Sequence, residues 1–156
     1  ERLEPECARQ ASGGPGGMVL MLDLDHFKRV NDTWGHATGD VVLVHLARML
    51  KGNLLRSHDL AGRLGGEEFA VLLPGTTAQE ATAIGERLRH ALEQSHIRAG
   101  DGTSFQVTMS IGVAPLQGDA HAPLAQADAA LYEAKNTGRN KVVLAQPEEA
   151  APEKTP

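Results

Sequence analysis

The sequence predicts an α+β domain in which helices pack on a central, mostly antiparallel sheet. Short apolar runs that end in acids or turn residues predict strands, and apolar stripes at helical spacing predict helices between them. The adjacent glycines Gly65 and Gly66 separate two strand-like segments and predict a hairpin. The resulting order is strand, helix, hairpin, helix, strand, helix, strand, which is typical of helices packed on a sheet built partly from hairpins.

Each element rests on its own pattern. The apolar run 18–24 predicts a buried strand, and apolar side chains recur at helical spacing within 40–51, which is therefore predicted to be a helix. Residues 105–113 alternate between apolar and polar and predict one strand, and Gly138 is placed to cap the last helix. The other expected elements are strands at 60–64, 67–73 and 141–145 and helices at 81–91 and 124–134.

Size and composition limit the possible functions. The 156 residues suit one domain, predicted at 18–145, with a helix remnant and flexible loop at 1–17 and a disordered tail at 146–156. Lys and Arg number 15 and Asp and Glu 20, and the net charge of −5 argues against a nucleic-acid partner. A single cysteine excludes an intrachain disulfide, and no apolar run reaches the roughly 18 residues that span a bilayer. We expect a cytoplasmic domain that is a fragment of a longer protein, and that parent protein could be membrane-anchored.

Acidic residues at the ends of predicted strands point to a metal site. Asp23 ends a buried strand, where an ionised carboxylate is costly unless it is paired or bound to a metal. In a sheet of adjacent strands this end can face the hairpin that carries Glu67, and a divalent cation would remove the repulsion between the two carboxylates. Hard oxygen ligands completed by phosphate describe Mg²⁺ bound with a nucleotide. Asp25 has an alternative role as the N-cap of a following helix.

Other residues could contact a nucleotide, and several of them have a structural alternative. Gly65 and Gly66 suit either an ordinary hairpin or a backbone that approaches a flat ligand. Lys135 and Arg139 would complement a helix dipole or bind a triphosphate, and Lys28 is a third candidate cation for the phosphates. The last two candidates are Asn31 and Asp40, which carry the groups needed to read a purine edge, and Asp40 could also be a helix N-cap.

Five blocks of the sequence together resemble the GGDEF family, the diguanylate cyclases. The pentapeptide GGEEF is the Glu variant of the family signature, and DLDHFKRVNDTWGHATGD matches the block around the first strand. RSHDLAGRLGGEEF, VTMSIGVA and ADAALYEAKNTGRNKV match the remaining blocks. The similarity runs in order from about residue 18 to residue 144 without a disruptive insertion.

The resemblance implies a nucleotidyltransferase that condenses two GTP molecules into cyclic di-GMP and releases two pyrophosphates. It implies a fold similar to the adenylyl cyclase core and the polymerase palm, and a two-fold homodimer in which each copy presents one GTP. Carried over by motif, the Mg²⁺ or Mn²⁺ ligands are Asp23, the Leu24 carbonyl and Glu67, and the catalytic acids are Glu67 and Glu68. The substrate would be held by His26, Phe27, Lys28, Asn31, Asp40, Gly65, Gly66, Lys135 and Arg139.

The resemblance also implies a site at which the product inhibits the enzyme. Arg56 and Asp59 match the family's Arg-x-x-Asp motif at its usual distance before the glycines, and Arg87 matches a secondary arginine of some members. Without the resemblance, Arg56 and Asp59 would be read as a surface ion pair of little energy.

The family's opening motif and the preceding sensory or dimerising segment are not visible in the sequence. In the family, an aspartate of that motif is associated with the arginine before the glycine turn, so Arg63 is expected to lack a partner. An alternative function is a non-catalytic receptor for GTP or cyclic di-GMP, although Asp23, Glu67 and Glu68 are all present. A second alternative is a cyclase for an adenine-containing dinucleotide, against which Asp40 argues.

Overall fold

The computed structural model describes residues 16–52, 59–116 and 121–145, and its centre is a five-stranded sheet. The strands lie in the order β2, β3, β1, β6, β7, and the bounds are Leu60–Gly65, Glu68–Pro74, Gly17–Leu24, Met109–Pro115 and Val142–Leu144. The central strand β1 pairs antiparallel with both β3 and β6, and only β7 is parallel to its neighbour. The predicted α+β class with a mostly antiparallel sheet is therefore confirmed.

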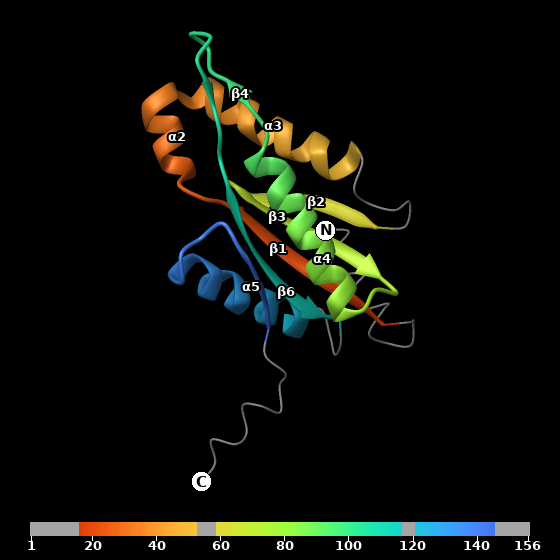
Figure 1. The fold of residues 1–156 in the computed structure, drawn as a ribbon. Helices are drawn as coiled ribbons and strands as arrows, with labels where there is room; N and C mark the ends of the chain where they lie inside the picture. Colours follow the sequence, from red (N-terminus) through yellow and green to blue (C-terminus); the bar gives the residue numbers. More distant parts are fainter. Residues whose placement is uncertain (1–15, 53–58, 117–120, 146–156) are drawn as a thin grey trace.

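Four helices cover the two faces of the sheet (Figure 1). Their bounds are Phe27–Trp34 for α2, His36–Gly52 for α3, Ala78–Glu93 for α4 and His121–Asn136 for α5. Side chains alternate along β1, so that Leu20 and Leu22 pack in one core with α3 and α4, whereas Val19 and Met21 pack in a second core with α5. Both faces of β1 are buried, which explains why its sequence is a continuous apolar run.

The expected strand at 105–113 is wrong in its length. Ser104–Phe105 is a separate short strand, β5, which pairs with β4 at Ile97–Arg98, and β6 begins only at Met109. The alternation was nevertheless informative, because its buried apolar side chains lie in one core. A local pattern shows which face a residue occupies, but it does not show where the chain leaves one sheet for another.

The hairpin and the helix ends differ from the prediction by one to a few residues. β2 continues through Gly65 with a bulge after Arg63, so the turn is formed by Gly66 and Glu67. Both glycines have positive φ, as expected. Asp40 is not a helix N-cap, because α3 already begins at His36.

The segments expected to flank the domain lie largely outside the described residues. Of the helix remnant and loop expected at 1–17, the structure describes only residues 16 and 17, and Gly17 already begins β1. The tail expected at 146–156 lies outside the described residues entirely. Within the described part of the chain, no helix has both the length and the apolar character needed to cross a bilayer.

We predict that Gly112→Ala destabilises the domain by about 1–3 kcal/mol, the usual cost of overpacking a core. A Cβ at Gly112 in β6 would lie 2.1 Å from the Ala127 carbonyl oxygen and 2.4 Å from the Leu131 nitrogen, and both are backbone atoms of α5. Gly62→Ala in β2 is the matched control, because a Cβ there meets nothing within 4 Å. Urea unfolding of both variants checks this, and equal midpoints would contradict it.

Candidate active site

The end of β1 meets the hairpin between β2 and β3. Asp23 lies directly opposite Glu68 in the antiparallel pairing, and the Leu24 amide donates to the Glu67 carbonyl at 3.4 Å. Residues paired across an antiparallel ladder project to the same face. The structure thus brings the Asp23, Glu67 and Glu68 positions together at one edge of the sheet.

Asp23 is held in an environment that disfavours its charge. The residue is 4% exposed, and its Oδ2 accepts a hydrogen bond from the Lys135 ammonium of α5. Burial raises the pKa of Asp23 to about 6, against the opposing effect of Lys135 and with a further increase from the charges of Glu67 and Glu68. One basic group therefore compensates this carboxylate only in part.

The second oxygen of Asp23 fits the expected metal site. Oδ1 is buried and has no hydrogen-bond partner in the described part of the protein. Within that same part, no group of three or more His, Cys, Asp or Glu side chains is arranged to hold a metal. The shell of a cation here would therefore need a backbone carbonyl, such as that of Leu24, and oxygens of the ligand itself. That donor set suits Mg²⁺, which is usually bound through one or two carboxylates together with phosphate.

Asp25 has a role that the sequence reading missed. The N-cap of α2 is His26, with φ of 56° and no side-chain cap, so the N-cap role considered for Asp25 is wrong. Asp25 is buried and accepts hydrogen bonds from the hydroxyls of Thr108 and Ser110, both at 2.7 Å. The sequence contained a signal for this role. Thr108 and Ser110 are polar residues that alternate with the buried apolar residues of the same segment, and their hydroxyls are available to a buried acceptor.

The three candidate phosphate-binding cations lie in different surroundings. Lys135 contacts Asp23, and Arg139 follows α5 in a turn with φ of 61°. Lys28 is 89% exposed on α2, and its ion pair is with Asp32 of the same helix at 3.0 Å. The His26 and Phe27 positions lie at the first turn of α2, where backbone N–H groups have no partner within the helix.

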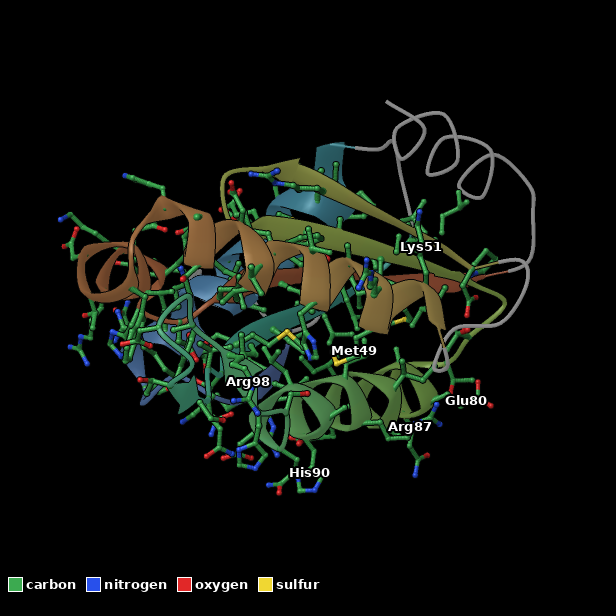
Figure 2. All side chains as sticks on the ribbon, turned by 90° about the horizontal axis from the view of Figure 1, so that it is seen from above. Met49, Lys51, Glu80, Arg87, His90 and Arg98 are labelled. Carbon is green, nitrogen blue, oxygen red and sulfur yellow. The ribbon has the colours of Figure 1, made fainter. Side chains whose placement is uncertain are left out.

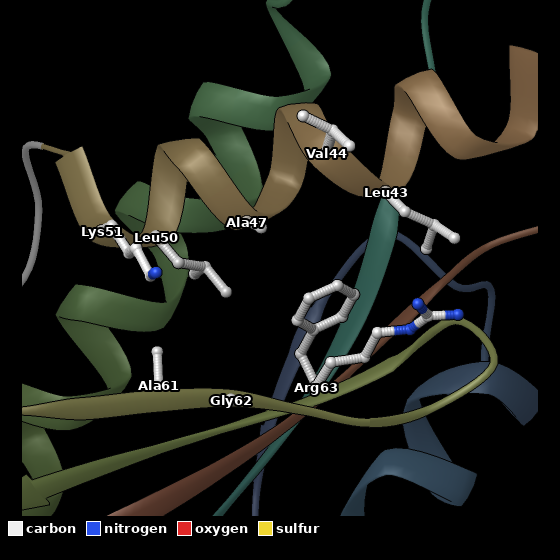
Figure 3. A pocket seen from close by; sticks show the side chains of 9 residues that line it. Leu43, Val44, Ala47, Leu50, Lys51, Ala61, Gly62 and Arg63 are labelled. Atoms are coloured by element: carbon white, nitrogen blue, oxygen red, sulfur yellow. The ribbon is translucent and has the colours of Figure 1, made fainter.

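The structure brings together the two residues expected to read a base. Asn31 on α2 packs against Gly39 on α3, where a Cβ would lie only 1.9 Å from the Asn31 Oδ1. Asp40 is the next residue and is exposed to solvent. One helical turn further along α3, a pocket of about 320 Å³ opens between α3 and β2 (Figure 3). Its lining includes Leu43, Val44 and Gly62.

The expected product-inhibition site is only partly described. Arg56 lies outside the described residues, and Asp59 is half-buried just before β2. Arg87 is exposed on α4, on the side of the domain that also carries His90 (Figure 2). The expectation that Arg63 lacks a partner is wrong, because its Nε donates to the Gly66 carbonyl at 2.8 Å and so holds the hairpin turn.

We predict that Asp23→Asn stabilises the metal-free domain above pH 6. The raised pKa means that the folded state binds this proton more tightly than the unfolded state, so the charge costs stability as the pH rises from about 4 to above 6. The isosteric amide removes that cost, which corresponds to roughly 3 kcal/mol. Unfolding of both proteins with EDTA present at pH 4 and pH 8 measures the difference. A gain equal at the two pH values would contradict the burial of the charge.

Comparisons with known proteins agree with this geometry. The family profile described as "Diguanylate cyclase, GGDEF domain" matches residues 1–141. The chain is 46% identical over 129 residues to diguanylate cyclase A of Treponema denticola, covering 81% of this chain but 34% of that protein. The chain therefore spans about a third of the length of that curated relative.

Two solved structures share the fold. The GGDEF domain of DgcB from Caulobacter crescentus, in complex with c-di-GMP, is 35% identical with a TM-score of 0.86, covering 94% of this chain and 85% of that one. The active GGEEF domain of a diguanylate cyclase from Vibrio cholerae is 28% identical with a TM-score of 0.84, covering 94% and 96%. Since the profile covers most of the sequence and the fold is shared, the chain belongs to the GGDEF domain family.

Proposed function

We propose that this domain condenses two molecules of GTP into cyclic di-GMP and releases two pyrophosphates. The observation that carries the proposal is the buried Asp23, which lies beside Glu67, Glu68 and the ammonium of Lys135. One of its oxygens has no hydrogen-bond partner among the residues that the structure describes. The curated relative that shares 46% identity is named a diguanylate cyclase, and one solved relative holds c-di-GMP.

Asn31 and Asp40 would recognise the guanine. An amide can donate to the carbonyl of guanine, and a carboxylate can accept from its ring N–H and amino groups. The apolar part of the base would lie against Leu43 and Val44, which follow Asp40 by about one helical turn and line the pocket beside β2. Adenine presents the opposite pattern of donors and acceptors, so the same groups would disfavour ATP.

Asp23, the Leu24 carbonyl and Glu67 would hold Mg²⁺ or Mn²⁺. When bound, the cation would neutralise charge on the triphosphate and favour loss of a proton from the attacking hydroxyl. Lys135 already supplies positive charge at this position, and Arg139, Lys28 and the N–H groups of His26 and Phe27 would hold the remaining phosphate oxygens. Gly65 and Gly66 would let the hairpin backbone approach the nucleotide.

The chemistry is a phosphoryl transfer that depends on positioning and charge neutralisation. The 3′-oxygen of one GTP would attack the α-phosphorus of the other, and the bond from that phosphorus to the bridging oxygen would break. Pyrophosphate leaves with the bonding electrons, and the hydroxyl proton passes to Glu67 or Glu68. Repeating the step with the roles of the two nucleotides exchanged closes the ring.

Two copies of the domain would be needed, because one site holds one GTP and the product contains two. A two-fold homodimer would present each nucleotide to the other, and the rate would depend on how often the copies meet. A sensory or dimerising segment N-terminal to the domain would control this encounter in the cytoplasm, where GTP is available. Cyclic di-GMP bound by Arg56, Asp59 and Arg87 would act as a product inhibitor.

We predict that the domain at high concentration converts GTP and Mg²⁺ into cyclic di-GMP, whereas a Glu67→Ala, Glu68→Ala double variant forms none. The double variant removes two of the carboxylates at the sheet edge, so the site loses a proposed metal ligand and both candidate acceptors of the hydroxyl proton. Chromatography of the nucleotides measures the product. A rate that rises faster than linearly with protein concentration would support the requirement for two copies.

An Asp128→Ala, Glu133→Ala double variant is the matched control, because it removes the same charge from the exposed face of α5. It should keep full activity. If two copies of the parent domain fused to a dimerising coiled coil form no product but still bind GTP, the receptor alternative replaces the cyclase.

We predict that Gly39→Ala raises the KM for GTP roughly tenfold, the cost of about one hydrogen bond to the base. A Cβ at this position would overlap the Asn31 Oδ1 and lie 3.2 Å from the Phe27 ring, so the Asn31 amide must move. Gly52→Ala at the end of the same helix is the control, since a Cβ there meets nothing within 4 Å. Competition between GTP and ATP measures the effect, and an unchanged preference would contradict a role for Asn31 in reading guanine.

A further inference from the structure

The turn after α5 has a backbone conformation that needs support from its surroundings. Arg139 has φ of 61° and Asn140 has φ of 49°, and neither is a glycine. Left-handed conformations of such residues cost on the order of 1 kcal/mol each and persist when neighbouring groups fix them. The Arg139 amide donates to the Ala134 carbonyl at 2.9 Å, which ends the helix but does not fix Asn140.

The first support for Asn140 comes from the end of the central strand. The Asn140 backbone N–H donates to Asp25 Oδ2 at 3.0 Å. Asp25 is itself buried and held by Thr108 and Ser110, so it is a rigid acceptor. This hydrogen bond fixes the turn against the residues that follow Asp23.

The second support comes from α4. The Asn140 Oδ1 accepts from the Arg89 guanidinium at 2.9 Å, and its Nδ2 donates to Glu93 Oε2 at 2.9 Å. Arg89 is 17% exposed and also donates to Glu86 at 2.8 Å and to Glu93 at 3.1 Å. The hydrogen bond from Asn140, and then that from Arg89, lowers the pKa of Glu93, so Glu93 remains a charged acceptor. Both ends of the Asn140 amide are therefore held by one helix.

We propose that Asn140, held between Asp25 and the Arg89–Glu93 pair of α4, is a positioning residue that directs Arg139 toward the triphosphate. The inference rests on the proposed function, because it requires that Arg139 binds phosphate. Lys135 contacts Asp23 directly and does not need this support. Arg139 is exposed, so the direction of its side chain depends on the backbone that Asn140 fixes. Arg89 thus influences nucleotide binding from α4 without touching the nucleotide.

A double-mutant cycle tests the inference. Arg89→Ala, Arg139→Ala and the combined variant are titrated with the α,β-methylene analogue of GTP and Mg²⁺, since that analogue cannot react. We expect each single variant to weaken binding roughly threefold to tenfold, the value of about one hydrogen bond. The combined variant should bind no worse than Arg139→Ala alone, because Arg89 acts through Arg139. Losses that multiply would overturn the inference.

Two further variants separate positioning from stability. Asn140→Gly keeps the left-handed turn and its backbone N–H but removes the side-chain amide that contacts Arg89 and Glu93. This variant should weaken binding as much as Arg89→Ala does. Arg98→Ala is the control, because Arg98 is an exposed arginine that donates to the nearby Gly102 carbonyl at 3.1 Å. If Arg89→Ala does not fold, Arg89→Lys takes its place in the cycle.

The outcomes distinguish the two proposals. A parent domain that does not bind the analogue would overturn both the proposed function and the inference. Tight binding by the parent together with unchanged binding by Asn140→Gly, or by Arg139→Ala, would overturn the inference alone and leave the cyclase function in place.

Discussion

The burial of one carboxylate, that of Asp23, is the constraint on which the rest of the site depends. β1 has a strand on each side and a helical layer on each face, so its end delivers Asp23 into a region that disfavours charge. Lys135 contacts one of the two oxygens, and the other has no hydrogen-bond partner within the described ranges of the chain. A carboxylate whose charge costs the folded domain stability is therefore the group that the proposed chemistry uses, a trade between stability and function that is common in enzymes.

The site is assembled from parts that are rigid for different reasons. The central strands position the carboxylates through their backbone pairing, which places Asp23 directly opposite Glu68. The pair proposed to read the base, Asn31 and Asp40, depends instead on close contact between α2 and α3, where the absence of a side chain at Gly39 makes room for Asn31. The turn that carries Arg139 depends on hydrogen bonds from two other elements. Each part would therefore respond to a different kind of substitution.

Sequence reasoning located most of the elements and the acidic edge of the sheet, since apolar periodicity and adjacent glycines are local signals. The expected order did not contain α2 or β4. Sequence reasoning failed where the partners of a residue are remote in the chain. Asp25 resembles a helix cap locally, but its partners Thr108 and Asn140 lie 83 and 115 residues away. The strand expected at 105–113 was too long because the alternation begins in β5, which pairs with β4 in a separate ribbon, and continues into β6. Asp40 was expected to cap a helix, but α3 begins four residues earlier, at His36. The residue before His36 is Gly35, which has no side chain to signal a helix start.

The distance along the chain between Asp23 and Lys135, which is 112 residues, has a consequence for biosynthesis. The ribosome releases β1 and the hairpin with Glu67 and Glu68 well before it releases α5. Until α5 docks, the acidic residues repel one another without the ammonium that offsets them. Long-range contacts of this kind form late. A nascent chain that ends before α5 therefore holds these acidic residues without Lys135, and we expect the proposed site to be complete only after α5 has been synthesised.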